Sequence, residues 1–140
     1  MILSQILQPS LVKVPLAGKD KQSVITELVD LLDAGKLLLD KGIALQAVLN
    51  REQVRSTGIG SGIAIPHGKC NAVKELVIAL GIAAQPIDFD SVDNKPVSIV
   101  ILLLSPLDQT GPHIQALARI SRLMLDEAFR NKLQKASSAN

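Results

Sequence analysis

The stretches ELVIALGIAA (residues 75–84) and VSIVILLL (residues 97–104) contain the longest apolar runs in the chain. Both are rich in β-branched residues and almost uninterrupted by polar ones, which is typical of strands buried on both faces of a sheet. The segment between them, QPIDFDSVDNKP (residues 85–96), is polar and rich in turn-forming residues. We therefore expect two buried strands separated by a turn.

Helical patterns lie on both sides of these strands. Asp20 can cap a first helix that stops at Gly35, and Asp40 can cap a second that runs out near residues 51–54. A third long helix is expected from Thr110, and a last short one from near Asp126. The positions expected on the buried faces are Val24, Ile25, Leu28, Val29, Leu31 and Leu32 in the first helix, Ile43, Ala44, Ala47 and Val48 in the second, and Ile114, Leu117, Ala118, Ser121 and Leu125 in the third.

Helices that alternate with buried strands predict an α/β fold, with a mixed β-sheet sandwiched between helices. The 140 residues contain neither an internal repeat nor a linker. We therefore expect one domain over residues 1–140, with a frayed tail at about 134–140.

Composition narrows the possible partners. The formal net charge is only +2, aromatic residues make up 1% of the chain, and no run of Lys or Arg occurs, so we expect no nucleic-acid partner. Cys70 is the only cysteine, which favours a reducing cytoplasm. The first ten residues lack a basic signal-peptide region, and the apolar runs fall below the roughly 20 residues that span a bilayer. We expect a soluble, cytoplasmic protein without membrane insertion.

The stretch STGIGSGIAIPHGK (residues 56–69) holds the first of only two histidines. GIAIP (residues 62–66) is predicted to be a short strand that ends at its proline, with His67 directly after it. Pro66 stiffens the backbone, and Gly68 would let another molecule approach closely. His113 also follows a predicted strand, by one loop, so we expect the two histidines to meet at one edge of the sheet.

Spacing excludes several chemistries for this stretch. The dinucleotide motif would need Gly or Ala where Ile63 or Ile65 stands, and a phosphate-binding P-loop would need Ser or Thr in place of Cys70. Ser61 does not stand in a G-x-S-x-G hydrolase motif. Two alternatives stay open: a turn shaped by glycines with an incidental His67, and a zinc site of His67, His113 and either Cys70 or a carboxylate, whose spacing matches no short metal motif.

Phosphorylation of a histidine fits the residues better. A neutral imidazole has one ring nitrogen able to attack phosphorus, and glycine-rich turns offer backbone N–H groups to phosphoryl oxygens. Arg51 can add a planar pair of donors, and His113 can add one at the start of its helix. Each has an ordinary alternative: His113 as a packed core histidine, and Arg51 in a salt bridge with Glu52 or Asp40.

These residues resemble a known family. REQVRSTGIGSGIAIPHGK (residues 51–69) is similar to the active-histidine motif of type-2, fructose/mannitol-class enzyme IIA domains of the bacterial sugar phosphotransferase system. FDSVDNKPVSIVILLLSP (residues 89–106) and DQTGPHIQALARIS (residues 108–121) resemble the family's downstream strand and second-histidine helix. The likeness runs from about Ser4 to Leu133, and within the family it is closest to the nitrogen-regulatory IIA proteins.

The resemblance implies a function. His67 would accept a phosphoryl group from a histidine phosphocarrier of the HPr type, with Arg51 and His113 at the family's supporting positions and with neither metal nor cofactor. A regulatory protein of this kind would act on targets such as potassium-transport regulators and sensor kinases. The alternative is a sugar-specific IIA component that passes the group to a IIB domain. Family members usually continue into a further C-terminal helical segment, so stopping at Asn140 would affect stability or a partner surface.

Overall fold

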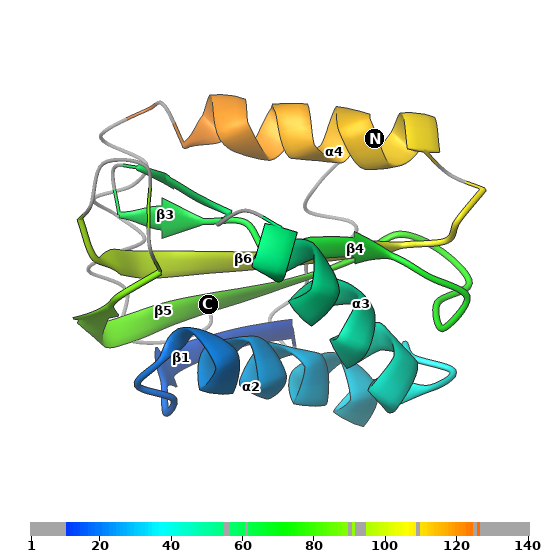
Figure 1. Cartoon of the computed structure of the whole chain (residues 1–140), viewed down its shortest axis with the longest axis horizontal. Coiled ribbons are helices and arrows are strands. Elements are labelled where there is room, and N and C mark those ends of the chain that lie inside the picture. The colour runs from blue at the N-terminus through cyan, green and yellow to red at the C-terminus, as the bar shows by residue number, and fades with distance from the viewer. Residues whose placement is uncertain are drawn as a thin grey trace.

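The computed structural model describes residues 11–54, 57–60, 62–89, 91, 95–108, 110–124 and 126. Within them a six-stranded mixed sheet lies between α4 on one face and α2 and α3 on the other, as Figure 1 shows. The predicted fold class, a mixed sheet between helices, is confirmed. The last short helix expected from near Asp126 and the tail at 134–140 lie outside the described residues. The elements, in chain order, are β1 (Val12–Leu16), α2 (Lys21–Ala34), α3 (Lys41–Val54), β2 (Gly58–Gly60), β3 (Ile63–Ala64), β4 (His67–Lys69), β5 (Val77–Ile87), β6 (Val97–Ser105) and α4 (Thr110–Leu123).

The two apolar stretches form the centre of the sheet. Its strand order is β1-β5-β6-β3-β2, with β4 also paired to β6. Strands β5 and β6 are antiparallel, and β1–β5 and β3–β6 are parallel. The predicted buried strands are thus confirmed, although β5 continues through Gln85 and Pro86 to Ile87, which the sequence placed in a turn. Strands β1 and β2 were not predicted at all.

The central strands feed two separate cores because their side chains alternate between the faces. On β6, Val100, Leu102 and Leu104 pack with α2 and α3, whereas Ile99, Ile101 and Leu103 pack under α4. Close-packed aliphatic cores resist deformation. The sheet is therefore a stiff support for residues at its edges.

Strands β3 and β4 run along β6 in one register, separated by Ile65 and Pro66. Ile63 faces Ile99, and His67 faces Leu103. Pro66 lacks an N–H group, yet its carbonyl accepts the Leu103 N–H at 3.0 Å, so pairing with β6 resumes directly after it. The short strand predicted over residues 62–66 is present as β3, but it covers only Ile63–Ala64. His67 does not follow it directly, as predicted, but is the first residue of β4.

The two helices on the lower face begin where predicted. Asp20 caps α2 by accepting the Ser23 N–H at 2.8 Å, and Gly35 lies at the helix's C-terminal cap. Asp40 accepts the Ile43 N–H at 3.1 Å at the start of α3. The side chain of Ile43 is 50% exposed, so its placement on the buried face was wrong, whereas Ala44 and Val48 are buried there as predicted.

The predicted buried face of α4 was wrong in part. Leu117 is partly buried against the core as predicted, but Ile114 is 60% exposed and Ala118 is exposed, and Leu125 lies outside the described residues. The fully buried stripe is built from other residues. The stripe consists of His113, Ala116, Ile120 and Met124. Because the stripe begins at a histidine, a prediction based only on apolar residues places the buried face about one position too far along the chain. In the structure, His113 therefore lies on the face that packs against the sheet. Among the described residues, no helix is both long and apolar enough to cross a membrane.

Candidate functional site

His67 stands at the head of β4 with one ring nitrogen fixed. Its Nδ1 lies 2.8 Å from the backbone carbonyl oxygen of Ile65. A carbonyl oxygen only accepts, so Nδ1 carries the hydrogen and donates it. In the neutral ring, Nε2 therefore keeps the lone pair. Half-buried at this sheet edge, His67 presents a nucleophilic nitrogen in a defined tautomer.

His113 lies beside His67, as the sequence predicted for the two rings. It sits in the first turn of α4, which Figure 1 shows at the same end of the molecule as β4. The two ring centroids are 5.4 Å apart and the ring planes are tilted by 59°. His113 is only 5% exposed, and its Nδ1 lies 2.5 Å from the hydroxyl of Ser105, the last residue of β6. The alternative interpretation of His113 was a buried histidine that is hydrogen-bonded for packing. His113 has that burial and that hydrogen bond, and it also lies next to His67.

Gly68 brings α3 close to β4. A Cβ atom at Gly68 would meet the backbone of Ala47 and Val48 at 3.3 Å, which is tighter than ordinary van der Waals contact. The glycine was expected to admit another molecule, and that expectation was wrong, because α3 occupies the space. This close approach of α3 carries Arg51 toward His67, and the positive charge of Arg51 acts on the imidazole.

Both histidines are held neutral at pH 7. Burial is the largest cause that lowers the pKa of His67, and Arg51 lowers it further against the opposing hydrogen bond to Ile65. Burial, followed by the charges of His67 and Lys69, lowers the pKa of His113 to about 4. A neutral His67 keeps its Nε2 lone pair available. The site therefore combines a nucleophilic imidazole, a second neutral imidazole and an arginine.

Glu52 is a buried carboxylate that the sequence suggested only as a partner for Arg51. Its Oε1 lies 2.9 Å from Lys21 Nζ and accepts the Thr57 N–H at 3.0 Å, while Oε2 accepts the Thr57 hydroxyl at 2.7 Å. These bonds join the start of α2 to the segment that leads into β2. The i, i+4, i+8 spacing from Ala44 through Val48 to Glu52 places the carboxylate on the buried face and could have revealed it.

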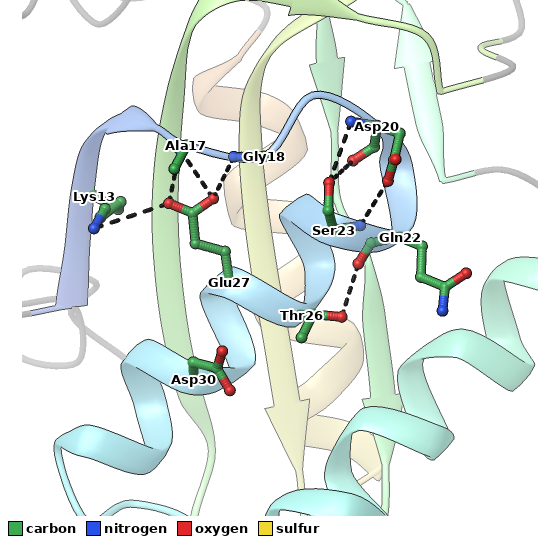
Figure 2. Close-up of a pocket in the computed structure, with 9 residues that line it drawn as sticks. All are labelled: Lys13, Ala17, Gly18, Asp20, Gln22, Ser23, Thr26, Glu27 and Asp30. Atoms are coloured by element: carbon green, nitrogen blue, oxygen red, sulfur yellow. Dashed lines mark hydrogen bonds and ion pairs between the residues drawn. The ribbon is translucent and has the colours of Figure 1, made fainter.

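A separate polar surface lies beside the start of α2 (Figure 2). Glu27 points at the turn after β1 and accepts the N–H groups of Ala17 and Gly18 at 2.8–3.0 Å, with Lys13 at 3.9 Å. The backbone donors that an anion would need are thus already used by a carboxylate. This surface anchors the helix to the turn.

The described residues contain no group of three or more His, Cys, Asp and Glu side chains that could hold a metal ion. Cys70, which was considered as a zinc ligand, has a buried free thiol. Its backbone N–H donates to the Ser105 carbonyl at 3.1 Å.

Comparison with known proteins gives consistent matches. The family model for EIIA 2 of the phosphoenolpyruvate-dependent sugar phosphotransferase system matches residues 5–140. A nitrogen regulatory protein from Klebsiella oxytoca is 36% identical over 139 residues, which cover 97% of this chain and 84% of that protein. The fructose-specific EIIABC component of Bacillus subtilis is 36% identical over 138 residues, but the chain spans only 22% of its length.

The fold has a close counterpart among solved structures. The crystal structure of nitrogen regulatory protein IIA-Ntr from Neisseria meningitidis superposes with a TM-score of 0.91 at 31% identity. The superposition covers 98% of this chain and 93% of the Neisseria chain. The arrangement of sheet and helices described above is therefore shared over almost the entire length of both chains.

Proposed function

Because this chain belongs to the EIIA 2 family of the phosphoenolpyruvate-dependent sugar phosphotransferase system, we propose that it carries a phosphoryl group on His67. The observation that carries the proposal is the hydrogen bond from His67 Nδ1 to the Ile65 carbonyl, which leaves Nε2 as the nucleophile. The donor would be a histidine phosphocarrier of the HPr type. The proposed location is the cytoplasm.

The proposed transfer exchanges one phosphorus–nitrogen bond for another. The Nε2 lone pair of His67 attacks the phosphorus of the carrier's phosphohistidine, and the bond to the carrier nitrogen breaks with its electron pair returning to that ring. The product ring of His67 retains its proton on Nδ1 and is formally cationic. Its hydrogen bond to the Ile65 carbonyl then becomes charge-assisted, which stabilises the phosphorylated form.

Arg51 and His113 would donate hydrogen bonds to the phosphoryl oxygens. The transition state spreads negative charge over these oxygens, so preorganised donors lower its energy. Arg51 offers a guanidinium on the side of α3, and His113 offers a neutral imidazole 5.4 Å away, centroid to centroid. Neither forms the bond to phosphorus, so both support the transfer without being required for it.

The proposed output is regulatory. Nitrogen regulatory proteins are among the relatives that match most of this chain, and IIA-Ntr shares its fold at a TM-score of 0.91. The phosphoryl oxygens carry roughly −2 charge, offset in part by the cationic ring, beside a stiff sheet, so the two states would differ in surface charge rather than in fold. Targets that pack apolar or acidic surface over His67, such as potassium-transport regulators or sensor kinases, would favour the unphosphorylated form.

The alternative output is sugar transport, because the fructose-specific EIIABC component matches this chain with the same 36% identity. In that case the group passes to a IIB domain. Neighbouring genes for IIB and IIC components would favour transport. Equal affinity of the phosphorylated and unphosphorylated protein for every regulatory candidate, measured by calorimetry, would also leave only transport.

The chemistry itself is tested by incubation with phosphoenolpyruvate, enzyme I and an HPr-type carrier, followed by intact-mass analysis. We expect the mass of one phosphoryl group, removed by acid because a phosphoramidate is acid-labile. No mass increase with any HPr-type carrier would contradict the proposal.

A further inference from the structure

Ser105 forms a hydrogen bond with Nδ1 of His113. Its hydroxyl lies 2.5 Å from His113 Nδ1, and its residue is fully buried at the end of β6. Pairing with β4 fixes the serine backbone, since Ser105 pairs with Lys69 and its carbonyl accepts the Cys70 N–H at 3.1 Å. The hydroxyl is therefore presented to the imidazole from a rigid element.

Burial decides the direction of this hydrogen bond. Among the described residues, His113 Nδ1 is the only hydrogen-bond partner of the Ser105 hydroxyl. If the ring donated from Nδ1, the hydroxyl hydrogen would be buried without an acceptor, at a cost of about 1–3 kcal/mol. If the hydroxyl donates, both groups are satisfied. The second arrangement leaves the single proton of the neutral ring on Nε2.

We propose that Ser105 is a positioning residue: its hydroxyl holds His113 in the tautomer with the proton on Nε2, so that this ring donates a hydrogen bond to the phosphoryl group on His67. The inference rests on the proposed transfer to His67. In the opposite tautomer, His113 would present a lone pair at Nε2 to the negatively charged oxygens and repel them. His113 thus supports phosphoryl transfer when a neighbouring group donates a hydrogen bond to its Nδ1.

The tautomer can be measured without any phosphoryl transfer. Long-range ¹H–¹⁵N correlation spectra of the unphosphorylated, ¹⁵N-labelled chain at pH 7.5 report which nitrogen of each histidine is protonated. We expect Nε2–H for His113 in the wild type and a mixture of both tautomers in Ser105→Ala. Phosphoryl transfer to Ser105→Ala should be slower by about tenfold, which corresponds to the loss of one hydrogen bond.

Two further variants separate positioning from packing. Ser105→Thr keeps the hydroxyl and should restore both the tautomer and the rate; if the added methyl group prevents folding, Ser105→Cys keeps a weak donor and should give intermediate values of both. Ser91→Ala is the matched control, because the Ser91 hydroxyl is also buried but has no hydrogen-bond partner among the described residues. It should change neither the His113 tautomer nor the rate.

The outcomes separate this inference from the proposed function. A wild-type His113 protonated on Nδ1, or a Ser105→Ala variant with unchanged tautomer and rate, would overturn the role of Ser105 while phosphorylation of His67 stands. A wild-type chain with the Nε2–H tautomer that takes up no phosphoryl group would overturn the proposed function, and with it the role of His113 as a hydrogen-bond donor to the phosphoryl group.

Discussion

The two histidines of the site lie side by side but are anchored by different kinds of group. The Nδ1 of His67 faces a backbone carbonyl, which only accepts, whereas the Nδ1 of His113 faces a hydroxyl, which can donate. In the transfer that we propose, the first contact leaves a lone pair on Nε2 of His67 and makes it the nucleophile. The second contact leaves a proton on Nε2 of His113 and makes that ring a hydrogen-bond donor. On this proposal, two chemically identical side chains acquire opposite roles from one neighbouring atom each.

The strongest test of this division of roles removes the nucleophile. His67→Ala should abolish phosphoryl transfer completely, because no other group would form the bond to phosphorus. Intact-mass analysis after incubation with the phosphocarrier measures this directly. Full labelling of the variant would mean that the nucleophile lies elsewhere.

Removing the supporting groups should weaken the transfer without ending it. His113→Ala and Arg51→Ala should each slow it by about 10²-fold, the usual effect of losing one preorganised donor. Rapid-quench kinetics with the HPr-type carrier provide the measurement, and Arg51→Lys serves as a control that keeps the charge but loses the planar pair of donors. Wild-type rates in both alanine variants would place Arg51 and His113 outside the site.

Acid should affect stability through the more deeply buried ring. The pKa of His113 is about 4 in the folded chain and 6.5 ordinarily, so the unfolded state binds more protons between these values. The contribution of His113 to the free energy of unfolding should be fully present above pH 6.5 and should be lost as the pH drops toward 4. This contribution is at most about 3 kcal/mol. Urea unfolding of the wild type and His113→Gln across this range isolates the contribution. Parallel pH profiles for the two proteins would refute it.

A smaller change should shift the helix that carries Arg51. Gly68→Ala adds a methyl group against the backbone of Ala47 and Val48, so α3 must move away by a few tenths of an ångström, at a cost of about 1 kcal/mol. Chemical denaturation gives the loss of stability, and the transfer rate should fall modestly. Gly111→Ala is the matched control, since its methyl group would have no neighbour within 4 Å among the described residues. Equal stability of the two variants would mean that α3 is not held closely by Gly68.

The sequence predicted the elements whose pattern is strong and local. Continuous apolar stretches revealed β5 and β6, and capping residues such as Asp20 and Gly35 marked α2. It failed where a tertiary partner determines the structure. Strand β2 has three residues, β4 begins directly after a proline, and both depend on neighbours already in the sheet.

The site was predictable to a different extent. The Pro-His-Gly sequence and the position of His113 after a strand predicted that the two rings meet, which the structure confirms. The roles of His67, Arg51 and His113 remain predictions. Ser105 escaped notice and Glu52 was suggested only as a partner for Arg51, because the residue type of a serine or glutamate does not indicate burial and only the folded contacts show what each one holds.

The most direct test of the account is to determine which nitrogen of which histidine bears phosphorus. The ¹⁵N-labelled chain, phosphorylated by the carrier, shows a ³¹P–¹⁵N coupling at the bonded ring nitrogen. We predict coupling at Nε2 of His67, with the proton of that ring still on Nδ1 beside the Ile65 carbonyl. Coupling at Nδ1 of His67, or at either nitrogen of His113, would contradict the account.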